Sequence, residues 1–495
     1  MKKIFMVLTL FVMVVALFAC DKDTPTPDPV DPTPVDPTPV DPTPPTVQLT
    51  YLAHNLGTEA DNNVERQLVS AFMVKYPHIK VTILERPKIP NPENPGEELD
   101  QDWNEFLTSR AAINKFPDVF TWFSSGAEAA SKGWAYDLKN VVNADNDFKN
   151  LPDAIKEAGQ YKGAQYALVT SQYNYGYVVN QSLIEDYIGD EYTLRYGMTY
   201  TQLLALCQNF YNATSVAAPE AGLMSIDGVS SEWYNWLPTA YNNELGYNAY
   251  DAAMGGFQYN SQAFKDAMTE IVKIQANPWA LQNMEGELFN EGKVMAHYVN
   301  TAELKAMMDA TKDPEHALYG KKIDFVGLPY VNGKSYVPSI IDLICVGKST
   351  KHPQEAYLLT KWMTYGLDGY TKRVELSGGS LAFAPLIDNA EGTLFSSYSA
   401  GFSILPEYTK FLTQHENFIP EGGKVVPGYW AARQPIFGEI SSRPGNVNSN
   451  VGDLMWDASH GLLANWIDYT RNAQDLCVAA LLEQQRLIDE EIAKY

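Results

Sequence analysis

The sequence predicts an α/β protein of two lobes. Strands and amphipathic helices alternate from residue 47 to residue 123, which is typical of an α/β fold. The middle and C-terminal parts are more helical, with short strands between the helices. About 450 residues follow the proline-rich N-terminal segment, and a chain of that length exceeds one typical hydrophobic core. Two lobes are therefore expected.

The first elements follow from hydrophobic periodicity. Residues 47–52 alternate between apolar and polar side chains as a strand does, and residues 79–83 alternate again. Between them Val64, Leu68 and Phe72 recur every four residues, which predicts a helix that ends before the next proline. The same reasoning predicts a surface loop at 86–100, a helix carrying Trp103, Phe106 and Leu107, and a strand at 117–123. This alternation favours a largely parallel, doubly wound sheet.

The later elements are mostly helical. Thr199 to Gln202 has the pattern of a capping box, which predicts the start of a helix that runs through Phe210. Further helices are expected near residues 261–276, 353–365, 404–416, 448–467 and 472–492. Short strands are expected at 294–299, 323–328 and 339–346.

The first twenty residues predict export and a lipid anchor. Two lysines precede an unbroken apolar run, which is the pattern of a secretory signal and is too short to span a bilayer comfortably. The run ends in Leu-Phe-Ala-Cys, which resembles the bacterial lipobox and implies a diacylglyceryl group on Cys20 after removal of residues 1–19. The alternative is an ordinary signal peptide that ends near a cysteine. Residues 20–46 repeat Val-Asp-Pro-Thr-Pro and predict a polyproline II tether that reaches about 70 Å.

Composition excludes several classes of function. The formal net charge is -24, and no cluster of Lys and Arg offers a phosphate-binding surface, so nucleic acid is not an expected partner. Three of the four cysteines remain apart from Cys20, and an odd number in apolar surroundings indicates buried free thiols rather than a disulfide framework. The seven histidines show no metal-ligand spacing. Neither a metal nor a cofactor is expected.

Five segments of the chain, in order, resemble one protein family. They are LVSAFMVKYPHIKV at 68–81, PDVFTW at 117–122, GAQYAL with YVVN within 163–180, FNEGKVMA at 289–296, and the stretch from Leu-Pro to HPQEAY within 328–357. This series is similar to the extracellular solute-binding proteins of ABC importers, in their sugar-binding group. Val169 departs from the family, which commonly has proline there. Beyond residue 365 the match is only in helical character and in Trp430 on a late loop.

The resemblance implies a two-lobe periplasmic-binding-protein-like fold with several hinge crossings and a ligand cleft between the lobes. Its N-lobe would comprise residues 47–172 with about 340–380, and its C-lobe about 173–339 with 381–495. Crossings are expected near 170–176, 336–342 and 376–384. The resemblance also implies a monomeric, non-enzymatic receptor on the outer face of the cell membrane, which closes on its ligand and docks on a membrane permease.

Aromatic side chains are the first candidates for a carbohydrate site, because sugars stack their C–H faces on aromatic rings. Trp122 ends a predicted strand, where open α/β sheets bind ligands, and it falls where the family carries a sugar-stacking Trp. Trp233 and Trp236 match an aromatic segment of the family, and Trp430 lies on a late loop of the kind that carries another. For each of the four, packing in a core is the alternative.

Polar candidates come from the same expected cleft. Glu59 follows the first strand, where family members often contact ligand, and Tyr173 lies at the first crossing. Asp342 sits within an apolar run, where a carboxylate must be paired or hydrogen-bonded, and a ligand hydroxyl is one candidate partner. Asn300 stands where the family commonly has Gly-x-Trp, which argues against a close copy of maltose recognition. Arg433 follows the late-loop tryptophan.

Three functions stay open at this point. The first, favoured by the tryptophans, is capture of a di- or oligosaccharide for import, with peptide, polyol phosphate or another anion as other ligands. The second is a secreted glycan-active enzyme, since glycosidases are also acidic and rich in aromatics. No Gly-x-Ser-x-Gly, HExxH or phosphate-loop pattern supports an enzyme. The third is a surface glycan-binding or adhesion lipoprotein without transport.

Overall fold

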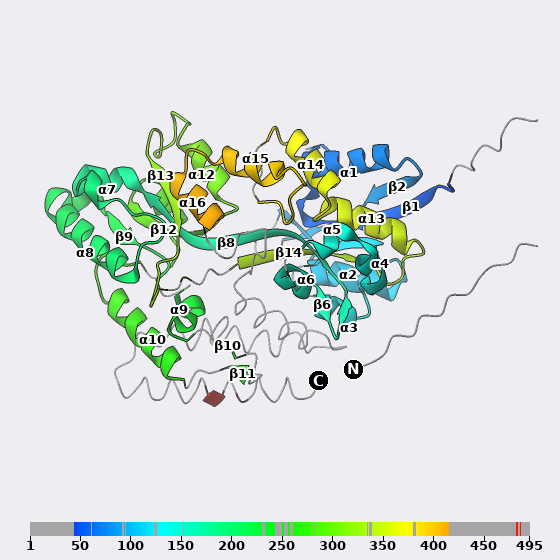
Figure 1. Ribbon diagram of the computed structural model, residues 1–495, viewed down its shortest axis with the longest axis horizontal. Coiled ribbons are helices and arrows are strands. Elements are labelled where there is room, and N and C mark those ends of the chain that lie inside the picture. The colour runs from blue at the N-terminus through cyan, green and yellow to red at the C-terminus, as the bar shows by residue number, and fades with distance from the viewer. Residues whose placement is uncertain are drawn as a thin grey trace, which may run out of the picture. The chain divides into compact units, whose positions relative to one another are not determined.

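The computed structural model describes residues 44–414 with short gaps, together with residues 482, 483 and 486 (Figure 1). The gaps are 61, 92–93, 95, 123–125, 152, 230–232, 243–249, 252–255, 258–260, 282, 334, 336–338 and 380–382. Several predicted features lie outside the described residues, namely the signal segment, Cys20 and most of the tether, Trp430, Arg433, the helix at 448–467 and most of the helix at 472–492. No helix in the described part is long and apolar enough to cross a membrane.

The N-terminal strands and first helix form as the hydrophobic periodicity predicts. Strand β1 (Val47–Leu52) pairs in parallel with β2 (Ile79–Ile83), and helix α1 (Val64–Lys75) connects them. The side chain of Asn63 caps α1 by accepting a hydrogen bond from the backbone N–H of Arg66. Leu68 and Phe72 are buried on the inner face of the helix. These three sequence predictions are confirmed.

The remaining elements before the long crossing strand complete the first part of the sheet. Strand β5 (Val119–Trp122) pairs with β1 in parallel, and all four of its residues are buried. Around it lie η1 (His54–Leu56), β3 (Lys88–Pro90), β4 (Glu98–Asp100), α2 (Trp103–Ala112), α3 (Gly126–Ser131), α4 (Lys139–Ala144), α5 (Asn146–Lys149), α6 (Asp153–Ala158), β6 (Gln160–Tyr161) and β7 (Ala164–Gln165).

Strands β14 and β8 connect the first part of the sheet, β2, β1 and β5, with the second part, β12, β13 and β9. Strand β8 (Leu168–Asn180) is antiparallel to β14 (Ser339–Val346) along its first half, and to β12 (Val294–Asn300) and β13 (Ile323–Gly327) along its second half (Figure 1). The sheet order is β2-β1-β5-β14-β8-β12-β9, with β13 also paired to β8. The expectation of a largely parallel sheet is confirmed for β2, β1 and β5, the strands from which it was drawn, but it does not extend to β14, β8, β12 and β13, which pair antiparallel. The chain leaves along β8 and returns beside it along β14, so these neighbouring strands run in opposite directions.

The second part of the chain is mainly helical, as expected. It contains α7 (Gln181–Tyr187), η2 (Asp190–Tyr192), α8 (Tyr200–Ala217), η3 (Pro219–Ala221), β9 (Met224–Ile226), α9 (Trp233–Tyr241), β10 (Tyr250–Asp251), β11 (Gly256–Phe257), α10 (Gln262–Gln275), α11 (Gly286–Asn290), α12 (Leu304–Ala310), α13 (Pro353–Met363), α14 (Leu367–Leu376), α15 (Thr393–Gly401) and α16 (Pro406–Gln414). The capping box predicted at Thr199 is present at the start of α8.

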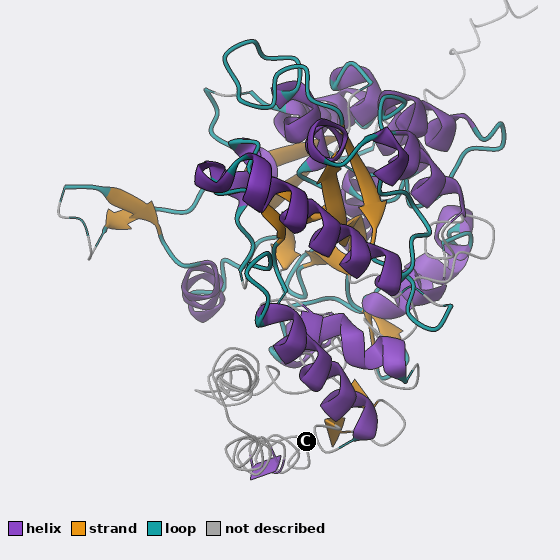
Figure 2. Cartoon of the chain, turned by 90° about the vertical axis from the view of Figure 1, so that its left-hand side faces the viewer, coloured by secondary structure: helices purple, strands orange, loops and turns teal. Residues whose placement is uncertain are grey.

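Three hydrophobic clusters form the interior. The first core is built on β1, β2, β5, α1 and α13, and the second on α8, α9, α10 and one face of β8 and β12. The third core is built on β13, α12, α15 and α16. On β8, Tyr177 and Val179 belong to the second core and Val178 to the third, so these two cores lie on opposite faces of the strand. The strands of the large sheet consequently lie inside with helices around them, whereas short two-stranded ribbons lie at the periphery (Figure 2).

Candidate ligand-binding site

One face of the crossing strand β8 carries a row of hydroxyl-bearing side chains. Ser171, Tyr173, Tyr175 and Tyr177 alternate along the strand and therefore point to the same side of the sheet. Ser171 stands opposite Asp342 of β14, whereas Tyr177 stands opposite Tyr298 of β12. We call these four residues of β8 the polar face. It runs from the first core to the second, which is where a ligand that touches both would lie.

At its first-core end, the polar face meets a carboxylate and a histidine. The hydroxyl of Ser171 donates to Oδ2 of Asp342 across 2.9 Å and also hydrogen-bonds with the phenol of Tyr173. Burial raises the pKa of Tyr173, so its phenol stays protonated. His54, just beyond the carboxyl end of β1, keeps an exposed side chain, but the protein atoms around it lower its pKa by partial desolvation, while the Asp342 carboxylate acts in the opposite direction. Asp342 and Tyr173 are both half-buried.

At its second-core end, the polar face is aromatic. The ring of Tyr175 stacks on that of Tyr298, with centroids 5.3 Å apart and planes 16° apart. Tyr177 meets Tyr298 edge-on at 5.6 Å, and its phenol oxygen accepts the indole N–H of Trp233 at 2.6 Å. Tyr177, Tyr298 and Trp233 are buried, whereas Tyr175 is half-buried. Tyr175 is thus the ring of this group that presents surface to a ligand.

The predicted tryptophans of the described part lie inside the cores. Trp122 is 2% exposed and packs edge-on against Trp134 at 5.4 Å, with the ammonium of Lys132 5.0 Å from its ring. In the second core, the ring centroids of Trp233 and Trp236 lie 5.5 Å apart, and the two side chains are 0% and 2% exposed, respectively. They are buried because they share the inner face of α9, at spacing i, i+3. Sugar stacking on these rings stays a prediction.

Of the predicted polar residues in the described part, three lie at or beside the polar face and one lies on a separate loop. Tyr173 and Asp342 are brought together through Ser171, as described above, and Asn300 stands opposite Tyr175 in the register of β8 and β12. The amide of Asn300 shapes the turn before α12, because its Nδ2 donates to Glu303 at 3.0 Å and its Oδ1 accepts from the backbone of Ala302. Glu59 is exposed on the loop before α1.

Sequence reasoning missed four residues of this site, namely His54, Ser171, Tyr175 and Tyr298. The alternation in Ser-Gln-Tyr-Asn-Tyr-Gly-Tyr, at 171–177, was the signal that identifies two of them. A strand with tyrosine at every second position and polar residues between is not recognisable as buried by hydrophobicity alone. His54 and Tyr298 carry no local signal, because they reach the site only through the pairing of distant strands.

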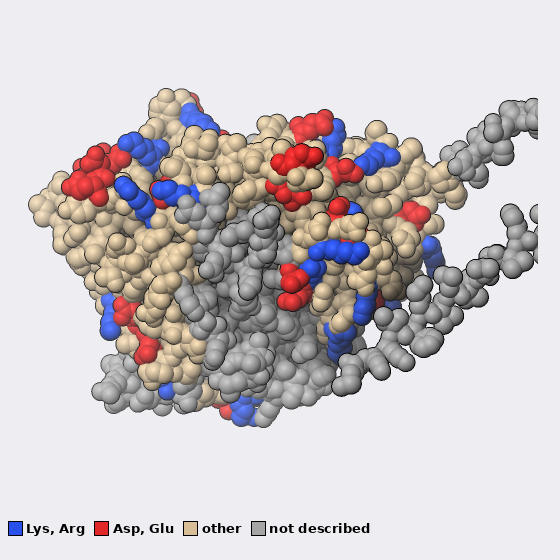
Figure 3. Space-filling model, viewed as in Figure 1, with Lys and Arg blue, Asp and Glu red and all other residues tan. Residues whose placement is uncertain are grey.

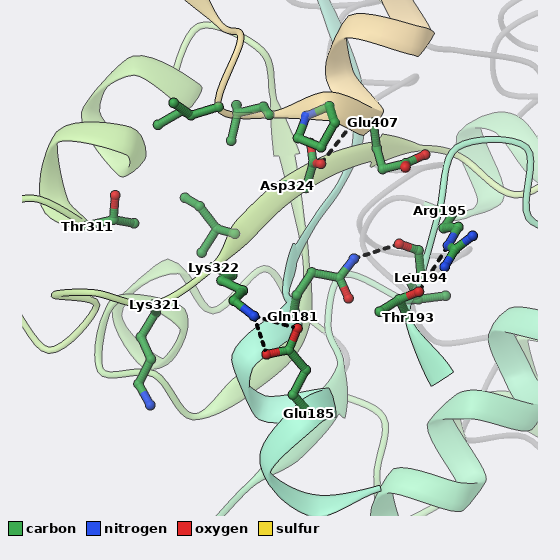
Figure 4. A pocket seen from close by; sticks show the side chains of 14 residues that line it. Gln181, Glu185, Thr193, Leu194, Arg195, Thr311, Lys321, Lys322, Asp324 and Glu407 are labelled. Carbon is green, nitrogen blue, oxygen red and sulfur yellow. Dashed lines mark hydrogen bonds and ion pairs between the residues drawn. The ribbon is translucent and has the colours of Figure 1, made fainter. Parts of the chain in front are cut away.

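A separate cavity of about 500 Å³ lies between α7, β13 and α16 (Figure 4). Most of its charged side chains already have partners within the protein. Lys322 pairs with Glu185 at 2.7 Å, and Asp324 accepts a hydrogen bond from the backbone N–H of Glu407 at 2.8 Å. No residue of the polar face lines it. Among the described residues on the face shown in Figure 3, Lys and Arg are interspersed with Asp and Glu and form no continuous basic patch. Within the described residues no group of His, Cys, Asp and Glu is arranged to hold a metal ion.

Comparison with known proteins places the chain in a family. Residues 96–391, more than half of the chain, match the family model of the bacterial extracellular solute-binding proteins. No curated protein sequence matches the chain.

Solved structures of binding proteins share the fold. An ABC substrate-binding protein of Listeria monocytogenes in complex with cycloalternan is 16% identical, with a TM-score of 0.58 over 90% of this chain and 99% of that one. The cyclic α-maltosyl-1,6-maltose binding protein of Arthrobacter globiformis is 15% identical, with a TM-score of 0.59 over 91% and 100%. The galacto-N-biose/lacto-N-biose I-binding protein of Bifidobacterium longum is 13% identical, with a TM-score of 0.57 over 91% and 98%.

These likenesses establish the architecture. The fold is the α/β fold of two lobes found in periplasmic solute-binding proteins, as the sequence predicts. The similar structures named above are binding proteins and not enzymes. With a family match over more than half of its length, the chain belongs to the bacterial extracellular solute-binding proteins.

Proposed function

We propose that this protein captures an extracellular carbohydrate, of di- or oligosaccharide size, and delivers it to the permease of an ABC importer. The family match supports the solute-binding role. The carbohydrate assignment draws support from similar structures whose own names specify cycloalternan, a cyclic maltosyl-maltose and lacto-N-biose. The observation that carries the proposal for this chain is the polar face of β8, with its half-buried tyrosines beside a carboxylate.

The polar face matches the chemistry of a sugar. Sugars expose apolar C–H faces and a ring of hydroxyls, so their sites combine aromatic rings with carboxylates and hydroxyls. Tyr173 and Tyr175 supply half-buried rings. Asp342 supplies a charged acceptor, and hydrogen bonds to an ionised acceptor are stronger than those between neutral groups. His54 and Ser171 lie within the same group and would complete the hydroxyl contacts.

The remaining predicted residues have supporting roles in this proposal. Trp233 would support the site without touching the ligand. Its indole N–H donates to the phenol of Tyr177 and so helps to position the aromatic end of the polar face. Trp122 has an indole N–H without a hydrogen-bond partner among the described residues, which suits a donor that meets ligand after a local rearrangement. Trp236, Trp430, Asn300, Glu59 and Arg433 stay proposed contacts of the cleft.

Capture would proceed by lobe closure. A ligand that contacts both lobes shifts the population toward the closed state, because only that state offers both sets of contacts. Strand β8 is suited to this role, since it pairs with β14 at one end and with β12 and β13 at the other. A ligand on the polar face would therefore lie where the lobes are joined.

The N-terminal segment would hold the receptor at the membrane. Two acyl chains on Cys20 give a stable anchor, whereas one chain gives only marginal binding. The proline-rich tether would then carry the globular part away from the lipid surface. This arrangement keeps captured solute close to a permease in the same membrane.

A ligand panel tests the proposed function. The full chain is titrated with maltotetraose, xylotetraose and lacto-N-biose, and with a tripeptide and inorganic phosphate for comparison. Tryptophan fluorescence and the melting temperature are recorded for each. The proposal expects at least one glycan to quench the fluorescence and to raise the melting temperature, because a ligand that binds only the folded state stabilises it. A response to the tripeptide or phosphate alone, or release of reducing ends from a glycan, contradicts it.

A further inference from the structure

Helix α14 is fastened to α1 by a buried ion pair. The guanidinium of Arg373 binds Glu65 in a fork, with Nε–Oε1 at 2.8 Å and Nη2–Oε2 at 2.9 Å, and Nη2 also donates to the backbone oxygen of Met363. Arg373 is 1% exposed and Glu65 15%. The planar fork of an arginine fixes the direction of the side chain, which a lysine ammonium does not.

The same guanidinium supports the segment that follows α14. Its carbon lies 5.3 Å from the centre of the Phe383 ring, within the range of a cation–π contact. The phenol of Tyr370, one turn earlier on α14, donates to the backbone oxygen of Phe383 at 3.1 Å. Tyr370 belongs to the third core, whereas Glu65 lies on α1 of the first. Helix α14 therefore contacts both the first and the third core, and Phe383 is contacted by both Arg373 and Tyr370.

Phe383 in turn packs against the polar face. Its ring meets that of Tyr173 at 6.1 Å with an interplanar angle of 89°, an edge-to-face contact. A continuous series of contacts thus leads from Glu65 through Arg373 and Phe383 to Tyr173. It connects the start of α1, the segment after α14 and the crossing strand β8, and these three parts are far apart in sequence.

We propose that Arg373 is a positioning residue for the ligand site, which holds Phe383 against Tyr173 and thereby sets ligand affinity and the balance between open and closed lobes. This inference rests on the proposed function for its ligand, but the lobe balance does not depend on a ligand. Arg373 itself is buried and does not touch the ligand. Its removal frees Phe383 to move and lets the ring of Tyr173 leave the orientation that the site requires.

A matched control is available in the same lobe. Lys361 of α13 pairs with Asp145 at 2.7 Å, and the two side chains are 24% and 9% exposed. This pair fastens α13 to the turn between α4 and α5, and no contact in the described part links it to Phe383 or Tyr173. Loss of Lys361 therefore removes a comparable ion pair without releasing the polar face.

The experiment compares Arg373→Met, Arg373→Lys, Phe383→Leu and Lys361→Met in the full chain. Three quantities are measured, namely the melting temperature, the Kd for the glycan that the panel identifies, with maltotetraose as the first probe, and the distance distribution between two spin labels without ligand. The labels are carried by p-acetylphenylalanine in place of Val74 on α1 and Val216 on α8, which are 81% and 83% exposed. Ketone-directed labels leave the cysteines untouched.

The expected result separates positioning from stability. Arg373→Met and Phe383→Leu raise the Kd about tenfold, within the usual range of coupling between sites, and broaden the ligand-free distance distribution. Arg373→Lys gives an intermediate effect. Lys361→Met lowers the melting temperature but changes the Kd less than about twofold and leaves the distribution as in the wild type.

Two outcomes overturn the inference. The first is that Phe383→Leu and Arg373→Lys both keep the wild-type Kd and the wild-type distance distribution between the labels. These two variants are expected to fold even where Arg373→Met does not. The other is an equal change in Lys361→Met. If no glycan binds the wild-type chain, the proposed function fails, and the ligand-free distance distribution alone then decides whether Arg373 sets the lobe balance.

Discussion

At the residue scale, Asp342 is the charged group on which we propose that ligand recognition depends. It accepts one hydrogen bond from Ser171 and keeps further acceptor capacity, because an ionised carboxylate has four lone-pair sites. Replacement of Asp342 by Asn removes the charge but leaves an oxygen for Ser171. Hydrogen bonds to a charged group contribute about 1.5–3 kcal/mol, so we expect the Kd for the bound glycan to rise roughly 10- to 100-fold.

Isothermal titration calorimetry with the glycan from the panel checks this expectation. Ser171→Ala is the companion variant, and it should weaken binding less, because it removes a neutral group that orients the carboxylate. An unchanged Kd in Asp342→Asn would place the ligand elsewhere in the cleft.

A second residue, Asp324, gives the stability of the protein a pH dependence. Burial raises the pKa of Asp324 to about 6, although backbone N–H groups of Glu407, Tyr408 and Phe325 favour its ionised form. The folded state therefore binds this proton more tightly than the unfolded chain, whose carboxyl has a pKa near 3.9. The resulting stability is fully present below pH ~4 and is lost as the pH rises through about 6.

The variant Asp324→Asn isolates this contribution. The free energy of unfolding of the wild type relative to the variant should increase by up to about 3 kcal/mol as the pH falls from 7.5 to 4, because about two pKa units separate the folded and unfolded states. Urea unfolding at a series of pH values measures it. A difference that is constant with pH would show that Asp324 titrates as it does in the unfolded chain.

At the element scale, helix α9 joins the second core to the polar face. Trp233 and Trp236 are buried on its inner side, and the indole of Trp233 donates to Tyr177 at 2.6 Å. Trp233→Phe removes this hydrogen bond and part of the ring, which should lower the free energy of unfolding by about 2–4 kcal/mol. Because Tyr177 keeps its edge-on ring contact with Tyr298, with centroids 5.6 Å apart, the Kd for glycan should change less than about threefold.

Chemical denaturation and glycan titration of the same variant separate the two roles of Trp233. A large loss of affinity without loss of stability would instead support direct stacking on the ligand, as the sequence alone predicts. Tyr177→Phe, which removes the acceptor and keeps the ring, is the matched control.

The elements with regular apolar spacing were predictable from the sequence. Helix α1 and strands β1 and β2 form as predicted, because their apolar stripes define which face is buried. Strand β8 was not predicted from hydrophobic spacing, since its middle is polar and aromatic and its burial depends on pairing with β14, β12 and β13. Helices α14 and α15 were missed for a similar reason. Their inner faces carry tyrosine and arginine, which become buried only through partners distant in sequence.

The candidate site was predictable only in part. Asp342 drew attention because a carboxylate in an apolar run needs a partner, and the structure supplies Ser171 as one. The tryptophans were predicted from residue type and from their place in the family pattern, and neither distinguishes a stacking surface from a core residue. Trp122 illustrates this, since the strand that carries it is buried on both faces. His54 was not identifiable, because β1 and β14 are brought together only by the fold.

At the scale of the whole molecule, the lipid anchor that we propose at Cys20 would determine where the receptor works. Cys20→Ser should move the protein from the membrane fraction to the aqueous phase, because it removes the thiol that would carry the proposed diacylglyceryl group. Partition between detergent and aqueous phases measures this. Cys207→Ser is the control, since Cys207 is a buried free thiol. A Cys20→Ser protein that stays in the detergent phase would mean that the membrane is reached in another way.

Capture of a carbohydrate between two closing lobes is the central claim, and the distance between spin labels on α1 and α8 tests it most directly. The labels replace Val74 and Val216, and the distance distribution is measured with and without a saturating concentration of the glycan from the panel. We expect the glycan to shift the distribution to a single narrow population, because a ligand bound at the polar face favours the closed lobes. A glycan that binds tightly while the distribution stays unchanged would contradict closure on a carbohydrate.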